Sequence, residues 1–262
     1  DRNEFEKGLE TMFTDKKFGS ACDRISIEDC LIGEEVSVFA ICDGKNYRII
    51  GDAQDHKRIL DGDKGPNTGG MGAYSPTNLC TPELLAKVEN DIIKPTLKGM
   101  HDLGHPYVGF LYVGLMIVEN SPFVIEFNVR MGDPETQVII PRINSSLYEI
   151  FKSAINGKIN EADISISLDT FITVVLASNG YPDKYKTGQT IGKIKPFKNN
   201  ILFHAGTEFD GQNYIVSGGR VLSAVSSGKS LGEAIKNVYN FIEQIQFEEI
   251  YFRKDIGQKG LR

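Results

Sequence analysis

The stretch EVSVFAICDG, residues 35–44, sets the fold class of this 262-residue chain. Its side chains alternate between the two faces of a strand, with one face formed by Val36, Val38 and Ala40 and the other by Ser37, Phe39 and Ile41. Asp43-Gly44 then favours a hairpin turn, and Tyr47–Ala53 forms the returning strand. Such a hairpin predicts an antiparallel sheet.

Helices and further strands flank this hairpin in an order that predicts an α+β fold. Phe5, Leu9, Met12 and Phe13 recur at helical spacing, so the chain opens in a helix. A long, polar, glycine-rich loop is expected over Gln54–Tyr74. The other elements expected in the first part are a strand at Arg24–Leu31, a helix from its Thr81 cap and Pro82 to about Leu103 with a break or kink at Pro95, a hairpin of Tyr107–Val118 and Phe123–Arg130, a helix opened by Asp133-Pro134, and a helix at Leu147–Asn156.

The polar, irregular stretch Gly157–Leu168 predicts a domain boundary near residue 162. We therefore expect one domain over residues 1–161 and a smaller one over residues 162–262. Elements expected in the second domain are strands at Phe171–Ala177, Gln189–Ile194, Ile201–Thr207 and Arg220–Val225, and a final helix at Ser230–Ile245.

Composition excludes several classes of function. The net charge is −6 and no block of Lys and Arg stands out, which argues against a nucleic-acid partner. No apolar run approaches the roughly 18 residues of a membrane span, so no membrane partner is expected. The spacing of Cys22, Cys30, Cys42 and Cys80 fits neither a zinc site nor a disulfide scaffold, and predicts reduced thiols in the cytoplasm.

The first group of residues suited to chemistry lies in VIEFNVRMGDPE, residues 124–135. On a strand Glu126, Asn128 and Arg130 share one face, while the other face, formed by Ile125, Phe127 and Val129, suits the core. Glutamate and asparagine oxygens are hard ligands of the kind that Mg²⁺ takes together with phosphate. The alternative is a solvent-facing strand with an incidental ion pair, and Asp133 alone suits a helix N-cap.

Two further segments suggest a nucleotide or substrate site. In Gln54–Arg58 and Gly65–Tyr74, glycines allow backbone N–H groups to approach an anion, and Lys57, Arg58 and Asn67 add donors. The alternative is a plain flexible loop, with His56 as a structural histidine rather than a base. In Ile27–Glu35 a strand end can pair with an adenine edge and the acids can accept from ribose, although a strand and turn with surface acids explain it equally.

A series of motifs follows in a fixed order: QDHKR (54–58), GPNTGGMGAY (65–74), EFN (126–128), RMGDPE (130–135), GYP (180–182), FHAGT (203–207), GGR (218–220) and RKDIG (253–257). Together they resemble the glycinamide ribonucleotide synthetase family over essentially the whole chain. That family has an ATP-grasp fold, in which two α+β subdomains clasp ATP, followed by a C-terminal domain. The resemblance implies that residues 1–161 are the C-terminal part of an ATP-grasp domain, an antiparallel sheet with helices, and that residues 162–262 are the small α+β C-terminal domain.

The resemblance also implies roles for individual residues. The hinge that faces adenine comprises Glu28, Asp29, Cys30 and Leu31, and Glu35 meets the ribose. The remaining roles are Arg58 and Asn67 near the phosphates, Glu126 and Asn128 as ligands of Mg²⁺ or Mn²⁺, and Arg130 and Asp55, together with Arg58, as catalytic residues that contact the substrates.

The reaction implied by the resemblance joins glycine to 5-phosphoribosylamine. ATP and glycine give glycyl phosphate, the amine attacks it, and glycinamide ribonucleotide, ADP and phosphate result, in de novo purine biosynthesis. Some family members are fused to other purine-pathway enzymes. Other ATP-grasp carboxylate–amine ligases, and a non-catalytic nucleotide-binding module, are the alternatives.

Two departures from the family pattern stand out. Gly109–Val118 contains no acid, so either Glu126 bridges two metal ions or one ion is held largely by phosphate and water. The family's phosphoribosylamine-binding domain and the lysines of the ATP-grasp lid are expected before Asp1. The fragment alone is therefore expected to be inactive and to bind ATP poorly.

Overall fold

The computed structural model describes residues 2–17, 19–193 and 200–261, and the chain divides into two compact units, 1–32 and 33–262. In the first unit α1 (Arg2–Leu9) continues into a π-helical turn (Glu10–Thr14), which confirms the predicted helix. A 3-10 helix (Gly19–Asp23) follows. The strand predicted at Arg24–Leu31 is wrong, because the described residues of this unit contain no second strand with which it could form a ladder.

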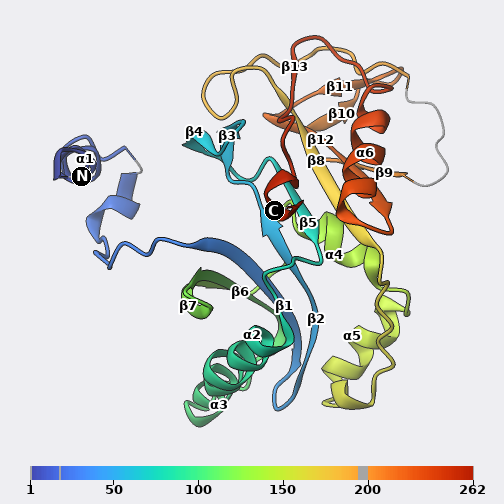
Figure 1. Cartoon of the computed structure of the whole chain (residues 1–262). Coiled ribbons are helices and arrows are strands. Elements are labelled where there is room, and N and C mark those ends of the chain that lie inside the picture. The colour runs from blue at the N-terminus through green and yellow to red at the C-terminus, as the bar shows by residue number, and fades with distance from the viewer. Residues whose placement is uncertain (1, 18, 194–199, 262) are drawn as a thin grey trace. The chain divides into compact units, whose positions relative to one another are not determined.

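One antiparallel sheet runs through the second unit (Figure 1). Its order is β7-β6-β1-β2-β5-β8-β12-β9, with β13 also paired to β8. The strands are β1 (Glu34–Asp43), β2 (Tyr47–Asp55), β5 (Gly72–Ser75), β6 (Val108–Val118), β7 (Ser121–Asn128), β8 (Thr170–Ser178), β9 (Asn200–His204), β12 (Arg220–Gly228) and β13 (Ile250–Tyr251). The short strand β5 pairs with both β2 and β8, so it joins the half of the sheet built on β1 to the half built on β8.

The alternation of β1 sorts its side chains into two cores, as predicted. Val36, Val38 and Ala40 pack with the helical layer of α2 (Pro82–Lys87), a π-helical turn (Val88–Ile93) and α3 (Lys94–Asp102). Phe39 and Ile41 pack on the opposite face against α4 (Thr136–Ile139) and α5 (Leu147–Ile155). Figure 1 shows these two helical layers on either side of β1 and β2.

A third core lies in the C-terminal half. Its main helix, α6 (Leu231–Ile242), begins after Ser230, whose hydroxyl accepts from the Glu233 N–H, and packs on β8 and β12. Two short hairpins lie outside the large sheet. The first, β3 (Arg58–Leu60) with β4 (Lys64–Asn67), precedes β5, and the second, β10 (Thr207–Phe209) with β11 (Tyr214–Val216), belongs to the C-terminal half. Three 3-10 helices cover Ile140–Arg142, Ile159–Glu161 and Gln258–Leu261.

Three further predicted elements differ from the structure. The expected loop over Gln54–Tyr74 contains the end of β2, the β3–β4 hairpin and most of β5, because distant segments supply partners for it. Of the strand predicted at Gln189–Ile194, only an isolated bridge at Thr190 forms, and residue 194 lies outside the described residues. The strand predicted at Ile201–Thr207 ends at His204, and β10 starts at Thr207.

The helix after Asp133-Pro134 starts later than predicted and is not capped by Asp133. It starts at Thr136, with Glu135 in the N-cap position and no side-chain cap. The Asp133 carboxylate instead pairs with Arg220 at 2.8 Å and accepts from the Gln137 amide at 3.0 Å. Tertiary partners therefore replace the local capping bond.

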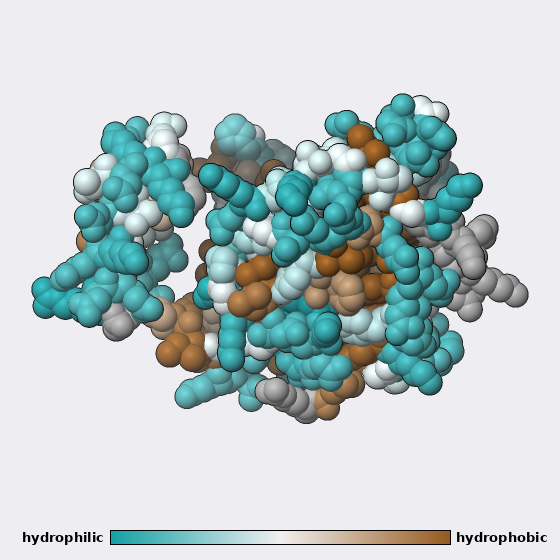
Figure 2. All heavy atoms as spheres, turned by 90° about the horizontal axis from the view of Figure 1, so that it is seen from above, coloured by the Kyte–Doolittle hydropathy of each residue, from teal (hydrophilic) through white to brown (hydrophobic). Residues whose placement is uncertain are grey.

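The strand β7 is exposed on both faces, contrary to the expectation that Ile125, Phe127 and Val129 enter the core. These side chains are 41%, 43% and 74% exposed. As the end of the sheet, β7 has a single neighbour, and an irregularity in the β6–β7 pairing at Gly114/Leu115 also interrupts its alternation. Figure 2 likewise shows apolar patches among the hydrophilic residues of the face that it views. Among the described residues no helix is long and apolar enough to cross a membrane.

Candidate active site

A lysine surrounded by carboxylates lies where β1, β2, β6 and β7 run side by side. The Lys57 ammonium forms an ion pair with Glu35, and the charges of Asp55 and Glu126 also act on it. A small cavity at this point has about 10 Å³ of space, enough for one water molecule. The polar residues and the glycine that line it are Glu35, Ser37, Asp55, Lys57, Tyr112, Gly114 and Glu126.

Strand register explains why these side chains meet. Ser37 on β1 is opposite Gly114 on β6, and Gly114 is opposite Glu126 on β7, so the three residues form one row across the sheet. The middle residue has no side chain. A Cβ on Gly114 would lie 3.1 Å from Glu126 Cγ and 3.1 Å from Tyr112 Cε1, so the missing methyl group leaves room for the cavity.

Electrostatics keep Lys57 charged. Burial works against its charge, but the hydrogen bond to Glu35 and the nearby carboxylates outweigh this effect and raise the pKa of Lys57. Burial, and next the neighbouring Glu135 carboxylate, raise the pKa of Asp55 well above its ordinary value. Burial also raises the pKa of Glu135, whose Oε1 lies 3.4 Å from Ser37 Oγ. The site therefore holds more carboxyl groups than its one ammonium group neutralises.

Two glycines let the chain pack closely behind these carboxyl groups. A Cβ on Gly70, whose φ is +109°, would lie 2.4 Å from Pro134 Cδ and 2.9 Å from Asp55 Oδ1. A Cβ on Gly132 would lie 2.4 Å from Glu135 Oε2. Any larger residue at either position would displace a carboxyl group of the site.

Four consecutive N–H groups of the glycine-rich segment are engaged within the protein and so are not free to bind an anion. Its N–H groups already donate within the protein: Thr68 to the Lys57 carbonyl, Gly69 to Tyr181 Oη, Gly70 to Thr68 Oγ1 and Met71 to the His56 carbonyl, at 2.8–3.0 Å. The glycines serve close packing instead. Gly69 illustrates this, because a Cβ there would lie 2.9 Å from Arg220 Cζ.

Four other predicted site residues lie on the β3–β4 hairpin, on β7 and just after β7. Arg58 and Asn67 are register partners on the β3–β4 hairpin, both exposed, and the Arg58 guanidinium donates to the Gly65 carbonyl at 2.7 Å. Asn128 is opposite Tyr112 and follows Glu126 by two residues, so it lies on the same side of β7. Arg130 lies beyond β7 and is exposed, with its guanidinium 2.9 Å from the Met131 carbonyl.

The predicted adenine hinge belongs to the first unit. Glu28, Asp29 and Cys30 are exposed and Leu31 is half-buried. No strand forms there, so a strand end that pairs with adenine is not seen in this segment.

His56 is a structural residue. It is 1% exposed, its Nε2 accepts from the Gly257 N–H at 3.2 Å, and burial lowers its pKa to about 3. An imidazole with this pKa stays neutral at physiological pH and, as a buried acceptor of a backbone bond, does not reach a substrate. The structure thus favours the interpretation of His56 as a structural histidine and not as a catalytic base.

Sequence reasoning missed part of the site. Lys57 was named only as an additional donor, and Glu135, Ser37 and Tyr112 were given no role. Lys57 and Glu135 do lie within the QDHKR and RMGDPE motifs, which was the available signal. Ser37 and Tyr112 gave none, because only the register across three strands places them in the site.

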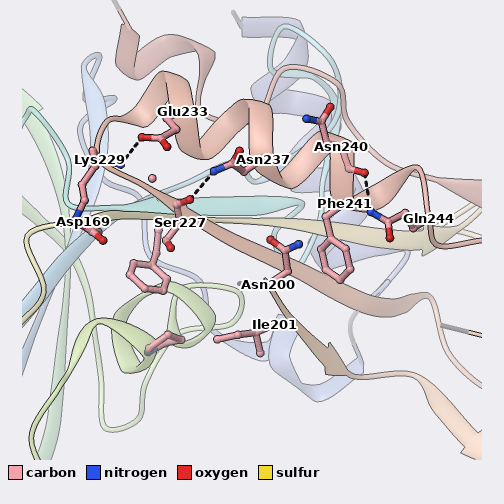
Figure 3. Close-up of a pocket in the computed structure, with 13 residues that line it drawn as sticks. Asp169, Asn200, Ile201, Ser227, Lys229, Glu233, Asn237, Asn240, Phe241 and Gln244 are labelled. Atoms are coloured by element: carbon pink, nitrogen blue, oxygen red, sulfur yellow. Dashed lines mark hydrogen bonds and ion pairs between the residues drawn. The ribbon is translucent and has the colours of Figure 1, made fainter. Parts of the chain in front are cut away.

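A separate groove of about 820 Å³ lies between α6 and the strands β9 and β12 (Figure 3). Its polar groups largely bond one another: Lys229 pairs with Asp169 at 2.8 Å, and the Asn237 amide donates to the Ser227 carbonyl at 2.9 Å. None of the predicted site residues lines it. Among the described residues, no group of three or more His, Cys, Asp or Glu side chains is arranged to hold a metal ion.

Comparison with known proteins gives consistent matches along the chain. The family described as "Phosphoribosylglycinamide synthetase, ATP-grasp (A) domain" matches residues 1–136, and "Phosphoribosylglycinamide synthetase, C domain" matches residues 171–259. A phosphoribosylamine–glycine ligase of Chlorobaculum tepidum is 47% identical over 99% of this chain and 62% of its own length. A bifunctional purine biosynthetic protein of Dictyostelium discoideum is 46% identical over 97% of this chain and 35% of its own length.

A solved structure agrees with these relatives. The crystal structure of a phosphoribosylamine–glycine ligase from Thermotoga maritima superposes with a TM-score of 0.80 and 33% identity, over 97% of this chain and 63% of that one. The chain therefore spans less than two thirds of the length of these similar proteins.

Proposed function

The chain belongs to the phosphoribosylglycinamide synthetase family, and we propose that the protein that contains it ligates glycine to 5-phosphoribosylamine with ATP in de novo purine biosynthesis. The observation that carries the proposal is the Lys57 centre at the junction of β1, β2, β6 and β7, which holds Glu35, Asp55 and Glu126 together. Three of the residues expected from the sequence to serve nucleotide, substrate and metal thus meet around one cation.

Magnesium would be held with few protein ligands. Glu126 and Asn128 offer a carboxylate and an amide oxygen on one side of β7, and β6 beside them carries no acid. Mg²⁺ keeps several waters and binds through one or two carboxylates together with substrate phosphates, so this donor set fits it, with Mn²⁺ as the alternative. When bound, the metal ion would neutralise phosphate charge during transfer.

The surplus of carboxyl groups suits a substrate that brings positive charge. Asp55, with Glu35 and Glu135 near it, would accept the ammonium group of glycine, and the exposed guanidinium of Arg130 would bind its carboxylate. Arg58 and Asn67 would contact the ATP phosphates. Glu35 would meet the ribose, and the role of facing adenine stays proposed for the segment Glu28–Leu31 from its sequence alone.

The chemistry proposed for this site needs positioning and charge neutralisation rather than a protein nucleophile. A glycine carboxylate oxygen bonds to the γ-phosphorus as the bond to ADP breaks; the amine nitrogen then bonds to the glycyl carbon as phosphate leaves and the nitrogen loses a proton. Two of the four thiols fit this view. Burial raises the pKa of Cys42 and of Cys80 to about 12, so both remain protonated and unreactive.

The organisation of the parent protein is part of the proposal. We place the division between the ATP-grasp domain and the C-terminal domain between residues 161 and 162, in the gap between the two family matches. Fusion to a further purine-pathway enzyme is compatible with the bifunctional relative. Activity in the cytoplasm is expected.

The test uses the full-length parent protein. Phosphate release from ATP is measured with glycine and freshly made phosphoribosylamine, with each substrate omitted in turn. Release that needs both substrates and yields glycinamide ribonucleotide supports the proposal. Release that follows another acid or amine would instead favour a different ATP-grasp carboxylate–amine ligase, and nucleotide binding without release would favour a binding module.

Glu126→Gln tests the metal ligand in the same assay. We expect loss of Mg²⁺-dependent turnover of at least about 100-fold, because an amide does not replace a metal-bound carboxylate. Glu119→Gln is the matched control, since Glu119 lies at the exposed turn of the same hairpin. Near-normal turnover of Glu126→Gln would refute its assignment as a metal ligand.

A further inference from the structure

The Arg220 guanidinium is surrounded by oxygen atoms from two distant segments. Its Nη1 donates to the carbonyls of Gly69 at 2.6 Å, Asp133 at 3.0 Å and Gly70 at 3.4 Å, and its Nη2 donates to the Asp133 carboxylate at 2.8 Å. The arginine is the first residue of β12 in the C-terminal half. One guanidinium group thus connects the C-terminal half, by hydrogen bonds, to both the glycine-rich segment and the Asp133 segment.

The fit around this group is close. A Cβ on Gly69 would lie 2.9 Å from the Arg220 guanidinium carbon, and the Gly69 N–H donates to Tyr181 Oη at 3.0 Å. Gly69 is therefore held at its carbonyl by Arg220 and at its N–H by Tyr181. Both partners come from the C-terminal half of the chain.

Both segments that Arg220 fastens continue directly into the candidate active site. Gly70, next to Gly69, packs against Pro134 and against Asp55 Oδ1. Two residues after Asp133 comes Glu135, whose carboxyl group faces Ser37. A shift of either segment would move Asp55 or Glu135.

We infer that Arg220 is a positioning residue of the ligase reaction, which holds the Gly69–Gly70 and Asp133–Glu135 segments at the separation that the glycine ammonium site requires. The inference rests on the proposed function. It also gives the C-terminal half a part in the reaction, although Arg220 has no free donor at Nη1 for a substrate. A planar guanidinium suits these acceptors, because Nη1 bonds to carbonyls of both segments while Nη2, held in fixed geometry beside it, bonds to the Asp133 carboxylate.

The experiment compares Arg220→Lys and Arg220→Ala in the full-length parent protein. We expect kcat to fall about 10- to 100-fold, the effect of misplacing a reacting group by up to about 1 Å. KM for glycine should rise, whereas KM for ATP should stay within about twofold. Guanidinium ion at millimolar concentration should restore kcat of Arg220→Ala, and methylammonium should not, since it lacks the fork.

Arg48→Lys is the matched control, because within the described part of the chain the Arg48 side chain on β2 makes one long hydrogen bond, of 3.5 Å to the Ala162 carbonyl. It should leave kcat and both KM values unchanged. Unchanged kcat in both Arg220 variants, or a loss that guanidinium does not restore, overturns the inference. Failure of the proposed function is recognised separately, because the unmodified parent protein would then make no glycinamide ribonucleotide.

Discussion

Gly114→Ala tests whether the row Ser37–Gly114–Glu126 forms the active site. The new methyl carbon would lie 3.1 Å from Glu126 Cγ and 3.1 Å from Tyr112 Cε1. A relaxed contact between carbon atoms needs about 3.5–4.0 Å, so each of the two contacts is short by roughly half an ångström. Tyr112 is 5% exposed and edge-packed on Phe39, whereas Glu126 is exposed, so strand β6 shifts slightly away from Tyr112 and the Glu126 side chain takes up most of the movement.

The expected consequence is a functional defect without a folding defect. The strand position gains about 0.4–1 kcal/mol from the smaller conformational freedom of the unfolded chain, and the crowding costs about as much. The net change in the free energy of unfolding should stay within about 1 kcal/mol. A catalytic group displaced by half an ångström should lower kcat/KM on the order of tenfold, with a higher Mg²⁺ requirement.

The assay is a Mg²⁺ titration of phosphate release by the full-length parent protein, accompanied by a denaturant unfolding curve. Gly99→Ala is the control, because a Cβ on this α3 glycine meets nothing within 4 Å. It should stabilise the protein slightly and leave activity unchanged. Wild-type kcat/KM and Mg²⁺ dependence in Gly114→Ala would show that the Glu126 side chain is not held for catalysis by this row.

Two further predictions follow from the charges of the structure. Because folding raises the pKa of Asp55, the folded protein binds this proton more tightly than the unfolded chain, so stability falls as pH rises above about 4, the ordinary value for aspartate. Asp55→Asn should therefore melt above wild type at pH 8 and close to it at pH 4, and an equal difference at both pH values would contradict this reasoning. Arg253 is 1% exposed and pairs with Asp63 and Asp255 at 2.8 Å, so Arg253→Met should lower the free energy of unfolding by about 3–5 kcal/mol, measured in urea. Lys229→Met, which loses an exposed pair, should leave the urea midpoint nearly unchanged, and equal losses in the two variants would contradict the role of burial.

The elements predicted correctly are those whose signals are local. The β1–β2 hairpin followed from side-chain alternation and a two-residue turn, and the helix predicted at Ser230–Ile245 corresponds to α6, which ends three residues earlier at Ile242. The segment between Gln54 and Tyr74 carried no such signal. Its β3–β4 hairpin is held by Tyr251, whose hydroxyl donates to the Ile59 carbonyl, and by Arg253, which donates to the Arg58 carbonyl, nearly 200 residues away.

In the candidate site, too, local signals predicted some features and long-range contacts decided the others. Alternation on β7 was enough to pair Glu126 with Asn128, but the same rule placed Ile125 and Phe127 in the core, where the edge position of β7 leaves them exposed. Lys57 belongs to the site only because β7, β6, β1 and β2 follow one another in the sheet. Residue types and spacing thus predict which groups can do chemistry, and strand order decides which of them meet.

The glycine-rich segment shows how the two halves of the sheet depend on each other. Glycines beside polar residues suggested free N–H groups for phosphate, yet Tyr181 takes the N–H of Gly69 and Arg220 takes its carbonyl. Strand β5, which begins at Gly72, then pairs with β8 and with β2, the strand that ends at Asp55. Since Asp55, Gly70 and Pro134 are in close packing, the C-terminal half sets the geometry of a carboxyl group that belongs to the ATP-grasp half. A fragment that lacked β8 and β12 would therefore keep Glu126 and Asn128 on β7 but lose the support that holds Asp55.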